Sequence, residues 1–182
     1  AEAARAHALW LPCGPDRADD TVHALLTAAA WRAQRRILVA SPYVVPDEAL
    51  LDALCHASRR GVVVQLVVPR RSNHRLADLA RERALRELVQ AGAQVWLQPQ
   101  MLHAKAVVVD DDFAMCGSLN LDSRSLFINY EAMAVWLGQP EIAALATWFA
   151  SLAAGCRRHD GRAASLPRDV LEGLVRAVGF QL

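Results

Sequence analysis

The sequence predicts an α/β fold in which a mixed, largely parallel β-sheet is flanked by helices on both faces. Short apolar, β-branched runs alternate with longer amphipathic segments through the first half of the chain, at the spacing of β–α–β crossovers. The chain has 182 residues, is 54% hydrophobic and carries a formal net charge of +1. Such a chain is long enough to bury a core, and one globular domain is the expectation.

The expected elements follow in order along the chain. Residues 1–18 carry two prolines and one glycine with little periodicity, so we expect a linker stub there and a single domain over residues 19–182. Helices are expected at about 19–36, 46–60, 75–91, 141–154 and 168–178. Strands are expected at about 37–40, 62–68, 95–97, 104–109, 113–116 and 130–137.

Charge and glycine mark the boundaries of the helices. Asp47 and Glu48 open the second helix, and arginines close the first two, where the helix dipole favours cations. Gly61 and Gly92 follow the second and third helices as C-terminal glycines. Residues 142–156 form the longest charge-free apolar stretch, which is shorter than the roughly 20 residues of a membrane span. A buried helix is therefore preferred there, with a membrane-surface helix as the alternative.

The four cysteines are scattered along the chain without a C-x-x-C pair or zinc spacing. They are Cys13, Cys55, Cys116 and Cys156. A disulfide framework and a metal site are both unexpected, and a reducing compartment fits best. No cofactor is expected.

Polar groups with reactive chemistry gather in residues 103–120. His103, Lys105 and Asp110 occur in one strand-like run, and Ser118 and Asn120 follow the next strand. Lys105 is the only lysine among twenty basic residues. Because a compact ammonium serves a different geometry from a planar guanidinium, we interpret Lys105 as a functional residue.

The alternation of a strand separates these groups by face. His103 and Lys105 share one face, while Asp110 has the opposite parity and is expected to be a supporting residue. If residues 111–112 form the hairpin turn, Asn120 lies opposite His103 and Ser118 lies opposite Lys105.

An imidazole, an ammonium, an amide and a hydroxyl on one face, without an acid pair or a metal ligand set, suit a phosphate group. Lys105 and Asn120 can neutralise and hydrogen-bond its non-bridging oxygens. His103 is then the nucleophile or the general acid/base. Ser118 can act in the site or stabilise a turn.

The pattern histidine, one residue, lysine, four residues, aspartate, six residues and Gly-Ser-x-Asn resembles the motif of the phospholipase D superfamily. The stretches at residues 14–16, 41–47, 117–125 and 129–131 are similar to the C-terminal half of bacterial cardiolipin synthases, which carries the second such motif. The resemblance spans nearly the whole chain and implies a phospholipase D-like half-domain.

The resemblance implies a mechanism without metal or cofactor. His103 attacks phosphorus to give a phosphohistidine, and a histidine from a second motif protonates the leaving alcohol and then activates the acceptor. Glu131 matches the acidic residue that orients the nucleophilic ring, since a carboxylate on one ring nitrogen fixes the tautomer.

The chain departs from the synthases because it holds one such motif. Either two copies pair, each contributing His103, or an N-terminal half has been lost, and the start at Ala1 favours the second alternative. An inactive or regulatory half that needs a partner chain is a further possibility.

The resemblance also implies the partners. The expected substrate is a phosphatidylglycerol-like phospholipid, with peripheral contact at the cytoplasmic face of the cell membrane or attachment through an N-terminal part. Arg124 and Arg71 are candidate substrate contacts, although a helix cap near Arg124 and a solvated loop at Arg71 are the plainer interpretations. Nucleic acid is not expected as a partner because the net charge is small. A homodimeric phosphodiesterase or nuclease that uses the same site is kept as the alternative.

Overall fold

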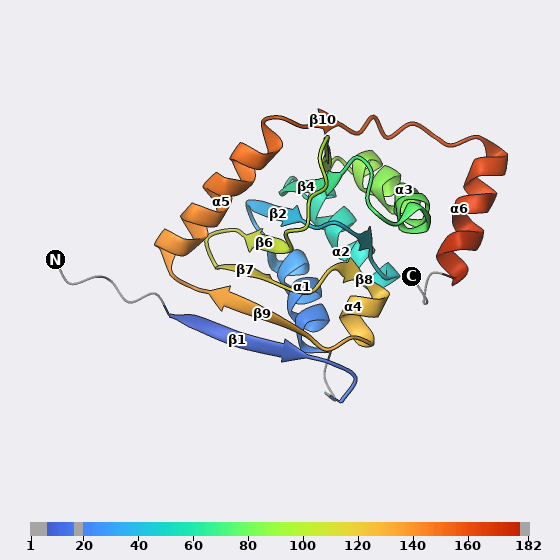
Figure 1. The fold of residues 1–182 in the computed structure, drawn as a ribbon. Helices are drawn as coiled ribbons and strands as arrows, with labels where there is room; N and C mark the ends of the chain where they lie inside the picture. Colours follow the sequence, from blue (N-terminus) through green and yellow to red (C-terminus); the bar gives the residue numbers. More distant parts are fainter. Residues whose placement is uncertain (1–6, 17–19, 179–182) are drawn as a thin grey trace.

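The structure, a computed structural model, describes residues 7–16 and 20–178. These residues form an eight-stranded sheet with helices on both faces and a separate two-stranded sheet (Figure 1). The predicted mixed α/β fold is confirmed. The helices are α1 (Thr21–Arg32), α2 (Glu48–Arg59), α3 (Arg75–Gln90), α4 (Ser123–Phe127), α5 (Gln139–Ala153) and α6 (Leu166–Val178).

The large sheet has the strand order β1-β9-β7-β6-β2-β4-β5-β10. Its strands are β1 (Ala8–Cys13), β2 (Arg36–Ala40), β4 (Val63–Pro69), β5 (Gln94–Gln98), β6 (Ala106–Val109), β7 (Phe113–Gly117), β9 (Glu131–Trp136) and β10 (Arg157–Arg158). The small sheet pairs β3 (Val44–Val45) with β8 (Leu121–Asp122) in parallel.

Within the large sheet, parallel pairing is confined to β2, β4 and β5, the strands that the helical crossovers connect. All other neighbours in the large sheet are antiparallel. The sheet is therefore less parallel than the sequence predicts, because β6 passes to the far side of β2 and begins an antiparallel run with β7 and β9.

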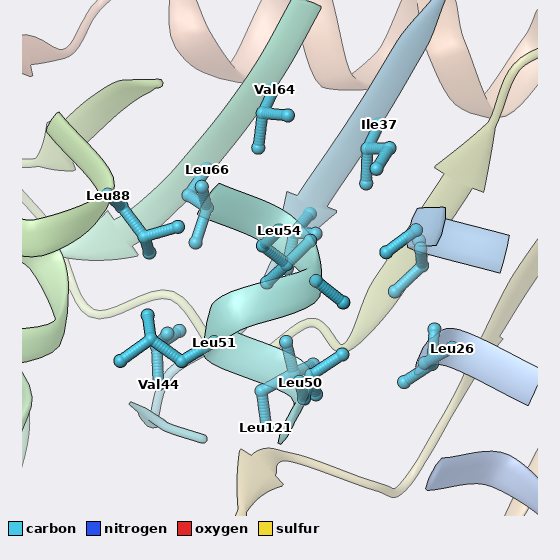
Figure 2. Close-up of a cluster of buried hydrophobic side chains, with 14 of the residues drawn as sticks. Leu26, Ile37, Val44, Leu50, Leu51, Leu54, Val64, Leu66, Leu88 and Leu121 are labelled. Atoms are coloured by element: carbon cyan, nitrogen blue, oxygen red, sulfur yellow. The ribbon is translucent and has the colours of Figure 1, made fainter. Parts of the chain in front are cut away.

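The core explains why the central strands are apolar on both faces. On β2, Ile37 and Val39 belong to the cluster under α1, α2 and α3, while Leu38 and Ala40 belong to the cluster under α5. Figure 2 shows the first cluster, in which leucines of α2 pack between β2, β4 and α3. The two layers of helices hold the strand ends in fixed positions.

The expected linker stub is wrong over residues 8–13. This segment forms β1, an edge strand that pairs along its whole length with β9. An edge strand with exposed residues lacks the apolar alternation that predicts strands, and the neighbouring prolines suggest a loop. Residues 1–6 and 17–18 of the expected stub lie outside the described residues.

The β6–β7 hairpin differs from the expected register by one residue. Val109 pairs with Phe113, so three residues, 110–112, form the turn instead of two. The Gly117 amide donates to the Lys105 carbonyl at 3.1 Å, which places Gly117 opposite Lys105. The predicted pairs of Ser118 with Lys105 and of Asn120 with His103 are therefore wrong.

Residues 157–162, expected as a polar loop, begin with β10, which pairs with β5. The segment that carries His103 and Lys105 lies between β5 and β6. Because Ala106 pairs with Ala40, the start of β6 lies beside the carboxyl end of β2. This edge of the sheet carries the candidate site.

Candidate active site

Lys105 is buried and contacts His103 at two points. Its Nζ donates to the His103 carbonyl oxygen at 2.9 Å and lies 3.1 Å from His103 Nε2. An ammonium has only donors, so this contact turns an unprotonated Nε2 toward Lys105. The side chain of His103 itself is exposed, and a ligand in solution can reach it.

Burial and two carboxylates act on Lys105 in opposite directions. Lys105 is 7% exposed, and burial lowers its pKa, while the charges of Glu131 and Asp122 partly offset that effect. The ammonium is thus a buried cation beside the exposed imidazole.

Asn120 is held by the start of α4. Its Nδ2 lies 3.3 Å from the Ser125 hydroxyl, and Asp122 caps α4 by accepting from the Ser125 amide at 2.7 Å. Burial raises the pKa of Asp122. The Oδ1 atom of Asn120 is buried without a hydrogen-bond partner among the described residues.

Glu131 belongs to a second chain of polar contacts. Arg124 Nε donates to Asn129 Oδ1 at 3.3 Å, and Asn129 Nδ2 donates to Glu131 Oε1 at 3.3 Å. Within the described part of the chain, Glu131 reaches the site through its charge on Lys105, and no hydrogen bond joins it to His103. Its expected role in orienting the ring stays a prediction.

Ser118 connects the end of β7 to β9 through two hydrogen bonds. Its hydroxyl accepts from the Ala132 amide at 3.0 Å, and its own amide donates to the Ala132 carbonyl at 3.0 Å. The preceding residue must be glycine, because a Cβ on Gly117 would lie 2.1 Å from the Ala132 carbonyl oxygen. Ser118 thus has the turn-stabilising contacts that the sequence offered as one of two interpretations.

Asp110 lies at the opposite end of β6 from Lys105. Its φ of 49° is left-handed, and its carboxylate accepts from the amides of Gln34, Arg35 and Arg36, each at 2.8 Å. Burial raises the pKa of Asp110, but these donors outweigh burial and bring the pKa below its ordinary value. Asp110 ties the hairpin to the start of β2, a supporting position.

Arg71 is exposed in the loop between β4 and α3, and no hydrogen bond or ion pair of its side chain is found among the described residues. The same loop carries a contact that the sequence reasoning missed. The Tyr43 hydroxyl donates to Asn73, and the Tyr43 ring lies 5.6 Å from the His74 ring. Tyr43 follows β2 at the site edge, and the stretch at residues 41–47 was the signal that could have identified it.

A cavity of about 340 Å³ lies next to Glu131. It is lined by Pro12, Cys13, Asp16, Ser118, Tyr130, Glu131 and Ala132. Sequence reasoning missed this cavity because one of its walls is the carboxyl end of β1, which was expected to be a linker.

The described residues contain neither a metal-binding cluster nor a membrane-spanning helix. No group of three or more His, Cys, Asp or Glu side chains there is arranged to hold a metal ion. Every helix in the described ranges is too short or too polar to cross a bilayer.

The chain resembles known proteins in both sequence and structure. Residues 26–153 match the family model described as cardiolipin synthase, PLD-like domain. Cardiolipin synthase A of Klebsiella pneumoniae is 37% identical over 119 residues, which cover 65% of this chain and 24% of the relative. The corresponding protein of Escherichia coli O157:H7 is 38% identical over the same lengths. The chain therefore matches about a quarter of these relatives.

The solved structures agree on the fold. NUC from Salmonella typhimurium, a phospholipase D family member, superimposes with a TM-score of 0.69 at 19% identity, over 84% of this chain and 99% of that chain. Phosphatidylserine synthase of Haemophilus influenzae superimposes with a TM-score of 0.71 at 15% identity, over 96% of this chain and 46% of that one. Because the family model matches more than half of the residues of this chain, the chain belongs to the cardiolipin synthase family of phospholipase D-like domains.

Proposed function

We propose that this chain is a catalytic half-domain that exchanges alcohols at a phospholipid phosphodiester, as its resemblance to cardiolipin synthases suggests. The observation that carries the proposal is the distance of 3.1 Å between Lys105 Nζ and His103 Nε2. A cation beside an unprotonated ring nitrogen is the arrangement that a nucleophile for an anionic phosphodiester requires.

The first step forms a phosphohistidine. The hydrogen bond from Lys105 to His103 Nε2 is exchanged for one to the substrate phosphate, and the freed lone pair of Nε2 attacks phosphorus. The bond from phosphorus to the leaving alcohol oxygen breaks, and a histidine of a second motif gives that oxygen a proton. Lys105 and the Asn120 amide stabilise the non-bridging oxygens, where negative charge is concentrated during the displacement.

The second step regenerates the imidazole. The acceptor hydroxyl gives its proton to the second histidine and attacks phosphorus, and the bond between Nε2 and phosphorus breaks. An alcohol acceptor gives a new phosphodiester, and water gives hydrolysis. The reaction needs no metal or cofactor.

The second motif must come from outside this chain, because Lys105 is its only lysine. A second half of a longer protein and a second copy of this chain are both possible sources. The relatives are about four times as long as the matched segment, which favours the first source. NUC, of which this chain covers 99%, supports the second, since a chain of this size is there a phospholipase D family member.

The proposed setting is the cytoplasmic face of the cell membrane, with a phosphatidylglycerol-like lipid as substrate. The supporting observation is the name of the relatives, because cardiolipin is itself a phospholipid. Arg124 and Arg71 are the candidate contacts for the anionic head group, since both are exposed cations.

The test is turnover of phosphatidylglycerol in mixed micelles, followed as release of glycerol, with double-stranded and single-stranded DNA as competing substrates. His103→Ala should abolish turnover, while His56→Ala, at an exposed histidine of α2, should leave it unchanged. A labelled phosphate that is stable to base and labile to acid should be trapped on the unmodified chain and be absent from His103→Ala. Cleavage of DNA without lipid turnover would overturn the lipid assignment.

A further inference from the structure

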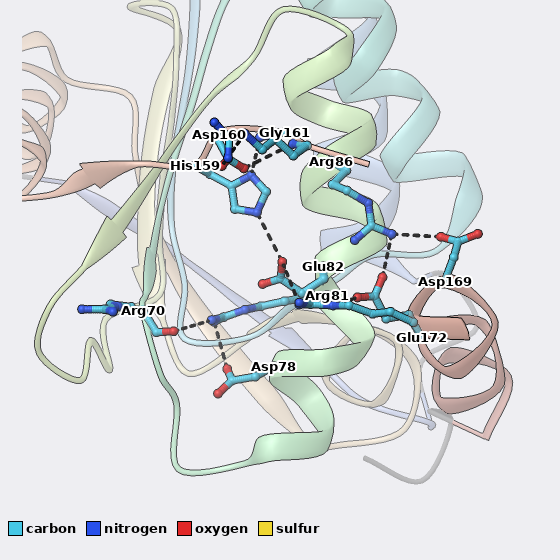
Figure 3. Close-up of polar contacts among 12 residues, drawn as sticks. Arg70, Asp78, Arg81, Glu82, Arg86, His159, Asp160, Gly161, Asp169 and Glu172 are labelled. Carbon is cyan, nitrogen blue, oxygen red and sulfur yellow. Dashed lines mark hydrogen bonds and ion pairs between the residues drawn. The ribbon is translucent and has the colours of Figure 1, made fainter. Parts of the chain in front are cut away.

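The helix α6 is attached to the domain through its polar side. Arg86 of α3 donates to Glu172 at 2.6 Å and to Asp169 at 3.0 Å, and Arg168 donates to Glu172 at 2.8 Å (Figure 3). Glu172 is 0% exposed and Arg86 is 7% exposed, so this ion pair is the buried part of the contact. The two acidic side chains described in α6 both face α3.

The apolar side of α6 points away from the domain. Four apolar side chains, here called the α6 stripe, share one face of the helix, because they are spaced by about one helical turn or are adjacent in sequence. They are Leu166, Val170, Leu171 and Leu174, at 80, 56, 50 and 61% exposed. An amphipathic helix normally buries its apolar face, so this orientation leaves the stripe for an external partner.

The segment before α6 carries exposed arginines, which suit a negatively charged partner. They are Arg157, Arg158 and Arg162, of which Arg162 pairs with Asp160 at 3.4 Å; in the first turn of α6, Arg168 is 55% exposed and pairs with Glu172 at 2.8 Å. Asp169 and Glu172 are engaged with Arg86. A helix with an apolar face, preceded by exposed arginines and with its acids paired to Arg86, has the composition of a helix that lies at an anionic lipid surface.

The position of α3 connects the stripe to the candidate site. The loop before α3 reaches the site edge through the contacts of Asn73 and His74 with Tyr43. Glu82, about two turns further along α3, lies 3.9 Å from Arg168 of α6. An external surface that contacts the α6 stripe therefore lies close to the sheet edge that carries His103.

We propose that the α6 stripe docks onto the interfacial region of an anionic phospholipid bilayer and holds the site edge near its substrate. This proposal rests on the proposed function, which makes a bilayer lipid the substrate. The ion pairs with α3 fix α6 with its apolar face outward, so that the docking surface is ready before the lipid is met.

The test is co-sedimentation of the whole chain with vesicles of phosphatidylglycerol and with vesicles of phosphatidylcholine alone. We expect binding to the anionic vesicles that weakens as salt is raised, because the arginines contribute. Leu171→Glu/Leu174→Glu should weaken binding by at least about tenfold, since it places charges where apolar side chains enter the bilayer. Leu9→Glu/Leu137→Glu, at two residues that are each 59% exposed, on β1 and after β9, is the matched control and should bind as the unmodified chain does.

Three outcomes would overturn the docking proposal. One is equal binding by the unmodified chain and the α6 double variant, and another is no binding to anionic vesicles at all. The third is conversion of a dimer to a monomer by the double variant with unchanged vesicle binding, which would make the stripe a contact between copies. Turnover of a soluble short-chain phosphatidylglycerol is measured in parallel, with the chain alone and with a chain that supplies a second motif. If that turnover is absent even when a chain with a second motif is supplied, while binding depends on α6, the proposed function fails and the docking site stands.

Discussion

Lys105 is buried and contacts an exposed reactive group of the site, the imidazole of His103. A group that is 7% exposed and hydrogen-bonded to the backbone of residue 103 has little room to move. Its ammonium is therefore positioned before any substrate arrives, and this is the condition under which electrostatic stabilisation of a transition state is most effective.

Replacement of Lys105 should separate charge from geometry. We expect Lys105→Met to lower kcat by about 100-fold or more in the competent assembly, because one stabilising donor is lost. Lys105→Arg should be nearly as impaired, since a planar guanidinium does not fit the buried position of the ammonium. Steady-state turnover of phosphatidylglycerol measures both. Arg83→Met, at an exposed arginine of α3, is the control, and near-normal turnover of Lys105→Arg would contradict the geometric argument.

Asp110 shows how far sequence reasoning reaches at a single residue. Parity alone placed it outside the reacting set, and the structure gives it three backbone donors from the start of β2. The donors could not be predicted, because residues 34–36 and Asp110 are more than seventy positions apart and meet only through the pairing of β2 with β6.

Asp110→Asn should destabilise the domain by about 1–3 kcal/mol, because the amide offers one acceptor oxygen in place of two. Asparagine tolerates the left-handed backbone, so the loss reports on the hydrogen bonds. The folded-state pKa of Asp110 is lowered, so its contribution is fully present above the ordinary value of 3.8 and is lost as pH falls through the lower folded pKa. Urea unfolding at pH 7 and at pH 3 and below measures this.

The exposed turn residue Asp112 provides the control for Asp110. Asp112→Asn should leave the free energy of unfolding within about 0.5 kcal/mol of the unmodified chain. A difference between Asp110→Asn and the unmodified chain that is the same at every pH would contradict the assignment to the carboxylate.

At the scale of elements, α6 is a helix whose position the sequence predicted and whose orientation only the structure shows. Its apolar spacing predicted a helix over residues 168–178, and the structure has it from Leu166. Periodicity predicts that a helix has an apolar face, but the direction of that face depends on the arginine of α3 that captures Glu172. This long-range contact leaves no local pattern in the sequence.

Loss of the buried ion pair should release α6. Glu172→Gln leaves Arg86 without its shortest partner and should cost about 3–5 kcal/mol in the attachment of α6, since both groups are almost fully buried. Hydrogen exchange should become faster across α6 and stay slow in β2. Arg83→Gln breaks only the exposed pair with Glu87, and exchange there should hardly change. Unchanged exchange in α6 of Glu172→Gln would contradict this account.

At the scale of the whole molecule, the order of elements was largely predictable and the sheet was not. Crossover spacing located the helices that join β2, β4 and β5. The antiparallel half depends on β1, which closes the far edge beside β9 and has no strand pattern of its own. The residues of the site motif were recognisable, whereas Tyr43 and the cavity beside Glu131 became evident only when β1 and the loop before α3 were placed.

The site is half of a catalytic centre if its second histidine comes from another chain, and mixing experiments can identify the source. In a homodimer that needs His103 from both copies, an equal mixture of unmodified and His103→Ala chains should retain about one quarter of the activity of the same total of unmodified protein. Independent sites would retain about one half. The His56→Ala chain, mixed in the same way, should leave activity proportional to total protein.

If the chain sediments as a monomer and gains activity only when a chain with another motif is added, the second motif belongs to a different half. Full turnover by an isolated monomer would contradict both arrangements, because no other lysine in this chain can form a second motif with a histidine.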